Sequence, residues 1–212
     1  MIIVGTEILT TFIHIVSESL LTPVVVLLVL FLIISILAIG GLINEKYTRK
    51  PMKKRELETL LNDDNSSSPE EIKNHVKSST LFNTQKDIIV NIIDNHNLDL
   101  EARKSFATKL VEDEQMILLK KTNLTDIFVR LGPVLGLLGT LIPLGPGLSA
   151  LGSGQIATLA SSLTIAFDTT VIGLTISSLS YVVSKYKKQW YESDLTTLET
   201  VAESVLEKLS KI

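Results

Sequence analysis

A long apolar stretch with many small and polar residues runs from Arg130 to Ser184. It reads RLGPVLGLLGTLIPLGPGLSALGSG and then QIATLASSLTIAFDTTVIGLTISSLSYVVS. Each part is long enough for a helix that crosses a bilayer, which needs about 20 residues. Glycine, serine and threonine at this density are typical of helices that pack closely on one another. The stretch therefore predicts a pair of membrane-spanning helices that lines something polar.

Glycines in this stretch recur at helical spacing. Gly132, Gly136 and Thr140 follow one another every four residues, so they share one face of a helix. Small residues on such a face let a second backbone approach closely. We therefore predict helix packing, and no chemistry, for the glycines of the two spans: Gly132, Gly136, Gly139 and Gly173.

Asp168 is the only charged residue between Leu131 and Ser184. An ionisable side chain at membrane depth is costly unless it faces a bundle interior or a wet cavity. On a helical projection it shares a face with Ser161, Thr164 and Thr175. Two interpretations stay open: a relay or electrostatic guide for a proton or cation, which we favour, or a carboxyl satisfied by hydroxyls that fixes the packing of subunits.

The rest of the chain alternates between apolar and polar segments. Pro23 to Ile43 is uncharged and long enough for one span, and a basic cluster from Lys46 to Arg55 follows it. Such clusters mark the cytoplasmic side, so the N-terminus is expected outside and the C-terminus in the cytoplasm. The predicted segments are an amphipathic interfacial segment (1–22), a first span (23–43), a helical cytoplasmic domain (44–125), a second span (126–150), a short outer turn (151–154), a third span (155–184) and a cytoplasmic C-terminal helix (185–212).

Several details of these segments are open to test. The amphipathic pattern of residues 7–20 suits either a helix in the membrane interface or one packed on a neighbouring subunit. Ser68 and Pro69 predict the start of a helix. The cytoplasmic helix before the second span is expected to continue into it, with Ile117 facing inward and Glu114 in solvent. The segment PLGPGLSALGSG, with Pro143 and Pro146, is expected to weaken or end that helix near the outer surface.

Composition excludes several classes of function. The chain has 212 residues with 45% hydrophobic content and a mean hydropathy of +0.35, typical of a membrane protein. It has no cysteine and only three scattered histidines, so no metal or cofactor site is predicted. A net charge of −3 without a basic stripe gives no support for nucleic-acid binding. No phosphate-binding loop and no set of nucleophile, base and orienting group is evident, so we do not expect an enzyme.

Two sequence motifs resemble those of the MotA/TolQ/ExbB proton channel family, the ring-forming subunits of ion-driven membrane motors. They are GPVLGLLGT at Gly132 to Thr140 and LASSLTIAFDTTVIGL at Leu159 to Leu174. Their order and spacing, on the second and third predicted spans, make the resemblance fairly specific. The short cytoplasmic domain and three spans look more like the TolQ/ExbB branch than the flagellar branch.

The resemblance implies a fold and a site. It implies an all-α membrane protein whose three spans carry long cytoplasmic helical extensions, assembled as a homo-oligomer, a pentameric ring in the cell (inner) membrane. The pore would hold the single-span helices of an ExbD/TolR-like partner that carries the titrating Asp. The pore residues that it implies are Thr140 and Thr170, with Thr169 and Asp168 beside them. Family members place an acidic residue where this chain has Ile165, so Asp168 is either its substitute one turn later or an independent feature.

Two functions follow as hypotheses from different classes. The first is a ring subunit of a motor driven by the proton- or ion-motive force, in which ions pass through a pore shared with the partner. The second is a non-conducting scaffold or signalling subunit that uses the same helices only to hold a partner.

Overall fold

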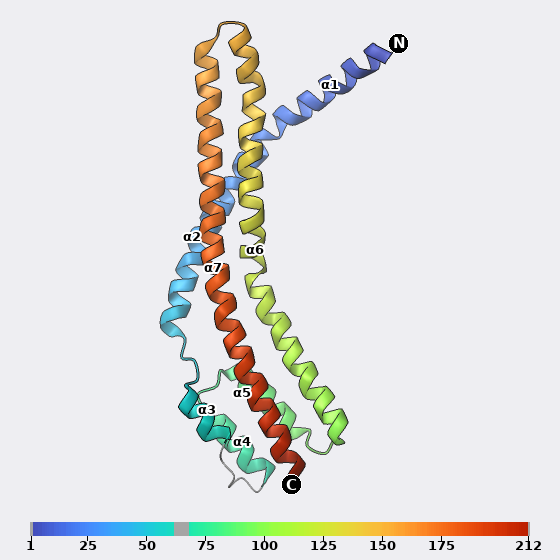
Figure 1. Ribbon diagram of the computed structural model, residues 1–212, viewed down its shortest axis with the longest axis vertical. Coiled ribbons are helices and arrows are strands. Elements are labelled where there is room, and N and C mark those ends of the chain that lie inside the picture. The colour runs from blue at the N-terminus through green and yellow to red at the C-terminus, as the bar shows by residue number, and fades with distance from the viewer. Residues whose placement is uncertain (1, 62–67, 212) are drawn as a thin grey trace. The chain divides into compact units, whose positions relative to one another are not determined.

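The computed structural model describes residues 2–61 and 68–211, and every regular element in these ranges is a helix (Figure 1). Three stretches are long and apolar enough to cross a membrane, namely Glu7–Thr48, Leu100–Gly152 and Ile156–Ser210. This confirms the all-helical prediction with three apolar helices. The elements are α1 (Ile2–Ser19), α2 (Leu21–Thr48), α3 (Lys54–Leu61), α4 (Pro69–Ser78), α5 (Asn83–Asp94), α6 (Leu100–Gly152) and α7 (Ile156–Lys211).

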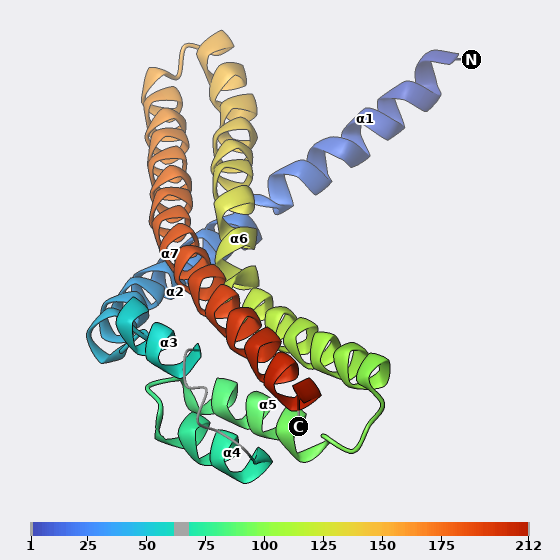
Figure 2. The ribbon, with the colours of Figure 1, turned by 60° about the horizontal axis from the view of Figure 1, so that its bottom comes forward.

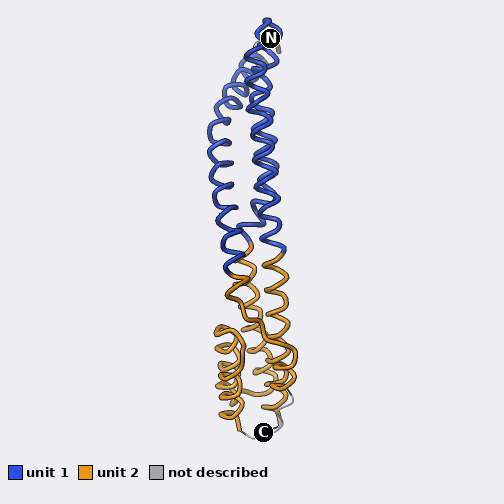
Figure 3. Tube along the Cα trace, turned by 90° about the vertical axis from the view of Figure 1, so that its left-hand side faces the viewer, with its two compact units in different colours: residues 1–44, 123–185 blue, residues 45–122, 186–212 orange. Residues whose placement is uncertain are grey.

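The chain forms two compact units, coloured separately in Figure 3. Unit 1 comprises residues 1–44 and 123–185, and unit 2 comprises residues 45–122 and 186–212. Helices α2, α6 and α7 each contribute to both units, since each is continuous across a unit boundary. The predicted third span and C-terminal helix are thus one helix, α7.

Unit 1 is a three-helix arrangement with α1 attached. The α6 and α7 segments run antiparallel and side by side, as Figures 1 and 2 both show. The α2 segment packs on this pair through a small apolar cluster, and Phe31 stacks on Phe128 with ring centroids 4.1 Å apart. Helix α1 makes little contact: Phe12 is 64% exposed and Ile13 57% exposed. Its amphipathic face is thus uncovered within the chain.

The segment PLGPGLSALGSG (143–154), which is expected to weaken or end the second span, does contain the end of that helix. Helix α6 continues through Pro143 and Pro146 and ends at Gly152. The turn that follows, residues 153–155, contains Gly154 at a φ of +74°, a left-handed conformation that glycine adopts without strain. Prolines are tolerated in membrane helices because neighbouring groups can satisfy the carbonyls that they leave free.

Pro133 shows how this compensation works. It lies inside α6 and has no backbone N–H, so the Val129 carbonyl four residues earlier loses its usual helical donor. The Ser177 hydroxyl on α7 donates a hydrogen bond to that carbonyl oxygen at 2.8 Å. A side chain of the third apolar helix therefore satisfies the backbone of the second.

Replacing Ser177 by alanine tests this compensation. We expect Ser177→Ala to destabilise unit 1 by about 0.6–1.7 kcal/mol, the range of side-chain hydrogen bonds between membrane helices. In a Pro133→Ala background the restored N–H can satisfy the Val129 carbonyl, so the same change should cost much less. A double-mutant cycle by denaturant unfolding in detergent measures this coupling, and a cost that is equal in both backgrounds would contradict it.

Unit 2 has its own apolar core, formed by the short helices α4 and α5 against the ends of α6 and α7. Helix α4 begins as predicted: Ser68 is the N-cap, its hydroxyl accepts from the Glu71 amide at 3.4 Å, and Pro69 follows. The fully buried members of the core include Ile89, Ile92, Leu198 and Val201.

The predicted inward face of α6 in unit 2 is partly wrong. Ile117 is 49% exposed, whereas Glu114, which was expected in solvent, is 8% exposed. The buried positions on this face of α6 include Ala107, Glu114 and Leu118, at helical spacing of seven and four residues. Ile117 precedes Leu118 by one residue and is therefore turned away from the buried face.

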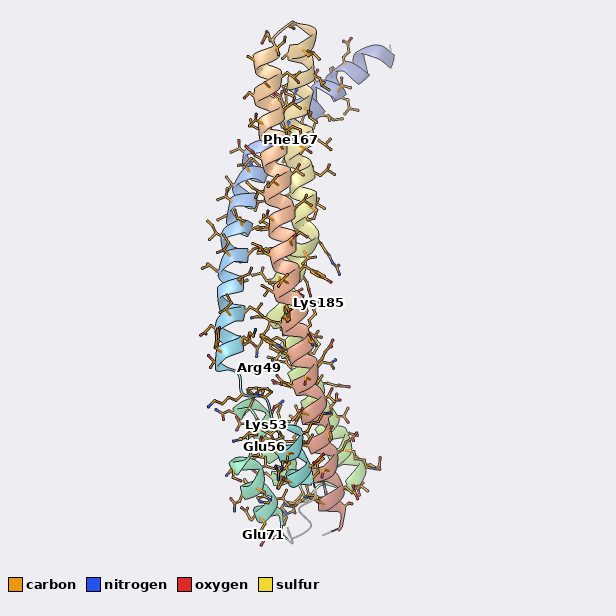
Figure 4. All side chains as sticks on the ribbon, turned by 60° about the vertical axis from the view of Figure 1, so that its left-hand side comes forward. Arg49, Lys53, Glu56, Glu71, Phe167 and Lys185 are labelled. Carbon is orange, nitrogen blue, oxygen red and sulfur yellow. The ribbon has the colours of Figure 1, made fainter. Side chains whose placement is uncertain are left out.

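Arg49, just after the end of α2, binds α7 within unit 2 (Figure 4). Its guanidinium forms an ion pair with Asp194 and donates to the Trp190 carbonyl at 2.9 Å, and it lies over the rings of Phe82 and Trp190. The Arg49 and Asp194 side chains are only 9% and 15% exposed. Burial raises the pKa of Asp194, and Arg49 acts in the opposite direction.

Glu45 and Tyr191 extend this cluster. Glu45 pairs with Lys187 at 3.1 Å and accepts from the Tyr191 hydroxyl at 3.4 Å. Burial, together with the charge of Glu45, raises the pKa of Tyr191 to about 12. The end of α2 is thus bound to α7 by two ion pairs, of which Arg49–Asp194 is the more buried.

Candidate functional site

The candidate site begins with the contact between α6 and α7 in unit 1, where three glycines of α6 meet Thr169 and Gly173 of α7. A Cβ added at Gly132 would lie 2.6 Å from the Gly173 carbonyl oxygen, and one added at Gly173 would lie 2.5 Å from the Gly132 carbonyl oxygen. One at Gly139 would lie 2.6 Å from the Thr169 Cβ. At these positions only glycine, which has no Cβ, lets the two backbones come so close. This is the packing that the glycine spacing predicts.

This contact gives a prediction with an internal control. Gly173→Ala should destabilise unit 1 by about 1–3 kcal/mol, because the added methyl overlaps backbone atoms that cannot move independently. Gly145→Ala, in α6, places its methyl where nothing lies within 4 Å, so it should be neutral or slightly stabilising. Thermal unfolding of both variants in detergent measures the difference. Equal midpoints would show that the glycines do not determine the packing.

Thr140 and Thr170 lie on the same side of the α6/α7 pair. Thr140 follows Gly139 and Thr170 follows Thr169, the two residues that meet at the contact. One residue forward turns a helical side chain by about 100°. Because the two helices are antiparallel (Figure 1), the residue that follows the contact residue on α6 and the one that follows it on α7 point to the same side of the pair. Both threonines are half-buried in the single chain.

The opposite side of the pair is covered by α2. Ile142 and Ile176 follow the contact residues Gly139 and Gly173 by three positions, which turns them by about 60° the other way. They pack with residues of α2, namely Val24 and Leu28. The two threonines therefore lie on the side that α2 leaves uncovered.

The hydroxyl groups of these threonines donate to their own helices. Thr140 Oγ1 donates to the Leu137 carbonyl at 2.6 Å, and Thr170 Oγ1 donates to the Ala166 carbonyl at 3.1 Å. Such backbone bonds are usual for threonine in helices and use the only proton of the hydroxyl. What each oxygen then offers to another molecule is its lone pairs. The two hydroxyl oxygens can accept a hydrogen bond from a donor on another molecule, or they can contact a cation.

Thr169 has a different position from its neighbours. It is 5% exposed, its side chain lies over Gly139, and its hydroxyl donates to the Ile165 and Ala166 carbonyls at 2.9 and 3.0 Å. Within one chain it is part of the helix contact. The structure thus brings Thr140 and Thr170 together on one side and places Thr169 between the helices.

Asp168 is exposed on α7 and lies away from both threonines. It precedes Thr169 by one residue and Thr170 by two, so it is turned by about 200° from Thr170. No hydrogen bond or ion pair to another described residue involves its carboxyl group. On an insertion scale an Asp at the centre of a membrane helix costs about 2.5–3.5 kcal/mol, so contact of this face of α7 with lipid is unfavourable.

Three hydrogen bonds of unit 1 were missed by the sequence reasoning. Ser35 and Ser180, both fully buried, join α2 to α7 at 3.0 Å, and Ser184 donates to Asp126 at 2.5 Å. The third is the bond from Ser177. The only available signal was serine in apolar helices, which indicates a bond between helices without identifying the partner.

The family model described as the MotA/TolQ/ExbB proton channel family matches residues 81–200, more than half of the chain. The matched range contains the α6/α7 contact, both threonines of the uncovered side, and Asp168. No curated protein and no solved structure matches the chain.

Proposed function

Because the chain belongs to the MotA/TolQ/ExbB proton channel family, we propose that it is the ring subunit of a membrane motor driven by the proton- or ion-motive force. In this proposal several copies, five by analogy with the TolQ/ExbB branch, surround the single-span helices of an ExbD/TolR-like partner. The three apolar helices support a location in a membrane. The basic residues after the first span support a cytoplasmic position for unit 2, with the N-terminus outside.

One observation carries the proposal: Thr140 and Thr170 share the side of the α6/α7 pair that α2 does not cover. In a ring with α2 toward lipid, this side faces the centre. The exposed residues of α6 near Thr140 include the apolar Leu137 and Leu141. The threonines are then polar groups that α6 and α7 present to a guest helix.

The hydroxyl geometry suggests how a guest carboxyl would be handled. With their protons bound to backbone carbonyls, the hydroxyl oxygens of Thr140 and Thr170 can accept a hydrogen bond from a protonated carboxyl. When the guest carboxyl loses its proton, a hydroxyl must rotate away from its carbonyl to donate instead. The two states of the guest therefore require two arrangements of the ring lining, which couples proton transfer to a change in contacts.

A flux measurement in liposomes tests the proposal. We expect protein reconstituted with its single-span partner to pass protons down a gradient, and protein reconstituted alone to pass few. Equal flux without the partner would contradict the shared pore. A partner that binds and remains bound while no flux occurs under any gradient would favour the scaffold function instead.

A further inference from the structure

The stripe of polar side chains around Asp168 is separate from the side that carries the two threonines. We define the Asp168 stripe as Ser161, Thr164, Asp168 and Thr175, which share one face of α7 and are all exposed in the single chain. A ring that turns Thr170 toward its centre turns Asp168 away from it by about 200°. The stripe then lies outside the central pore.

Arg130, the basic residue of the predicted second span, lies far from Asp168 along the helix axis: it precedes Gly139, which meets Thr169, by nine residues, about 13 Å. Residues 21–44 and 131–184 contain no Lys, Arg or His, so in an assembly of identical copies these segments offer Asp168 no basic partner. Carboxyl groups at membrane depth occur paired, or on ion and proton paths. With pairing to the spans of another copy excluded, a cation or a proton is the remaining counter-charge.

The neighbouring hydroxyls of the Asp168 stripe are arranged as acceptors. Thr164 Oγ1 donates to the Ala160 carbonyl at 3.0 Å, and Thr175 Oγ1 donates to the Val171 carbonyl at 2.8 Å. Their protons are used, so their free lone pairs cannot stabilise a carboxylate but can contact a cation or accept from a protonated carboxyl. Beside the Asp168 carboxyl, the Thr164 hydroxyl therefore offers an oxygen acceptor, the type of ligand that hard cations prefer.

A second copy of the chain is the occupant that the geometry favours over lipid. Facing hydrocarbon, the stripe would expose a carboxyl and three hydroxyls, which membrane helices avoid. Within the chain, α2 packs through the Ile142 and Ile176 side and α6 through the glycines, so neither covers the stripe. The next copy around a ring is the remaining element that can.

We propose that Asp168, with Thr164 one turn before it on α7, forms a monovalent cation site for H⁺ or Na⁺ at the contact between neighbouring copies. This site belongs to the ring subunit and is separate from the threonines that face the partner. The proposal rests on the ring assembly of the proposed function, but it needs neither the partner nor the central pore to be occupied.

Carbodiimide labelling tests occupancy on the purified assembly without its partner. Dicyclohexylcarbodiimide reacts with protonated carboxyl groups in apolar surroundings, and intact-mass measurement detects the adduct. We expect labelling that is absent in Asp168→Asn and that falls as pH rises. Protection by NaCl relative to choline chloride would assign Na⁺, and labelling that responds to pH alone would assign H⁺.

Two threonine variants sharpen this test. Thr164→Val should weaken the cation site roughly tenfold, seen as a shift of about one pH unit or a tenfold higher protecting concentration of Na⁺. Thr170→Val, on the other side of α7, should leave the titration unchanged. An Asp168 carboxyl that is unlabelled at every pH, or a titration that Thr164→Val does not alter, overturns the proposal.

A bulky substitution tests the contact between copies. Thr175→Trp should lower the fraction of assembled protein in native mass spectra, whereas Leu37→Trp, at a position of α2 that is 68% exposed, should not. If Thr175→Trp assembles as well as the wild type, the Asp168 stripe does not lie at the contact between copies, and the proposal is overturned. A wild-type protein that is monomeric would instead contradict the proposed function, whereas an assembled protein whose Asp168 is never labelled would contradict this inference alone.

Discussion

Thr170→Val is expected to reduce partner-dependent proton flux by about tenfold to a hundredfold while the assembly stays intact. The change removes one hydroxyl at nearly constant volume. The loss of a hydrogen bond to a charged group costs about 1.5–3 kcal/mol, and each 1.4 kcal/mol corresponds to tenfold in rate. The bond that Thr170 makes to the Ala166 carbonyl is dispensable, because a helical carbonyl already has a backbone donor.

The control for this variant is Thr170→Ser, which keeps the hydroxyl and should keep most of the flux. Thr140→Val should resemble Thr170→Val, since the two hydroxyls share one side of the helix pair. Liposome flux, together with native mass spectra of the same samples, separates transport from assembly. Full flux in an assembled Thr170→Val protein would mean that this side of the pair does not face the conducting path.

Arg49→Ala is expected to destabilise unit 2 by about 3–5 kcal/mol, because it leaves the Asp194 carboxylate buried without its partner. It also removes the contacts of the guanidinium with the Phe82 and Trp190 rings. Hydrogen exchange of the α5 and α7 amides in the full protein measures the local free energy of opening. Protection equal to the wild type would show that the ion pair contributes little.

The pH dependence of Arg49→Ala provides the control. Burial already raises the folded pKa of Asp194 above its ordinary value, and loss of the arginine raises it further. A raised carboxyl pKa contributes stability that is fully present below the unfolded pKa and is lost as pH rises through the folded pKa. The loss of stability caused by Arg49→Ala should therefore be smaller near pH 4 than at pH 7. Asp194→Asn in the same background should recover part of it at pH 7.

The helix content and the number of apolar helices could be predicted, because hydropathy and spacing act locally. The start of α4 at Ser68 and Pro69 was predictable for the same reason, since a cap depends on neighbouring residues. The continuation of α6 through Pro143 and Pro146 was not, because it depends on whether the surroundings accommodate a proline in a helix. The local rule predicts a weakened or interrupted helix.

The candidate site was predictable in composition but not in arrangement. Thr140, Asp168, Thr169 and Thr170 stand out in the sequence by their chemistry. Their division among three positions, the uncovered side of the pair, the interior of the contact and the far face of α7, depends on which face of each helix packs. Thr169 and Thr170 point in directions that differ by about 100° around α7. The contact of Gly139 with Thr169 determines which of the two lies between the helices.

The bond from Ser177 to the Val129 carbonyl has a consequence for biogenesis. When the translocon releases the second span alone, that carbonyl enters lipid with no donor, because Pro133 supplies none. The third span brings the missing hydroxyl, and the glycine contact forms at the same step. We therefore expect the two spans to leave the translocon together as a hairpin, and a chain truncated before Ser177 to be held there or degraded.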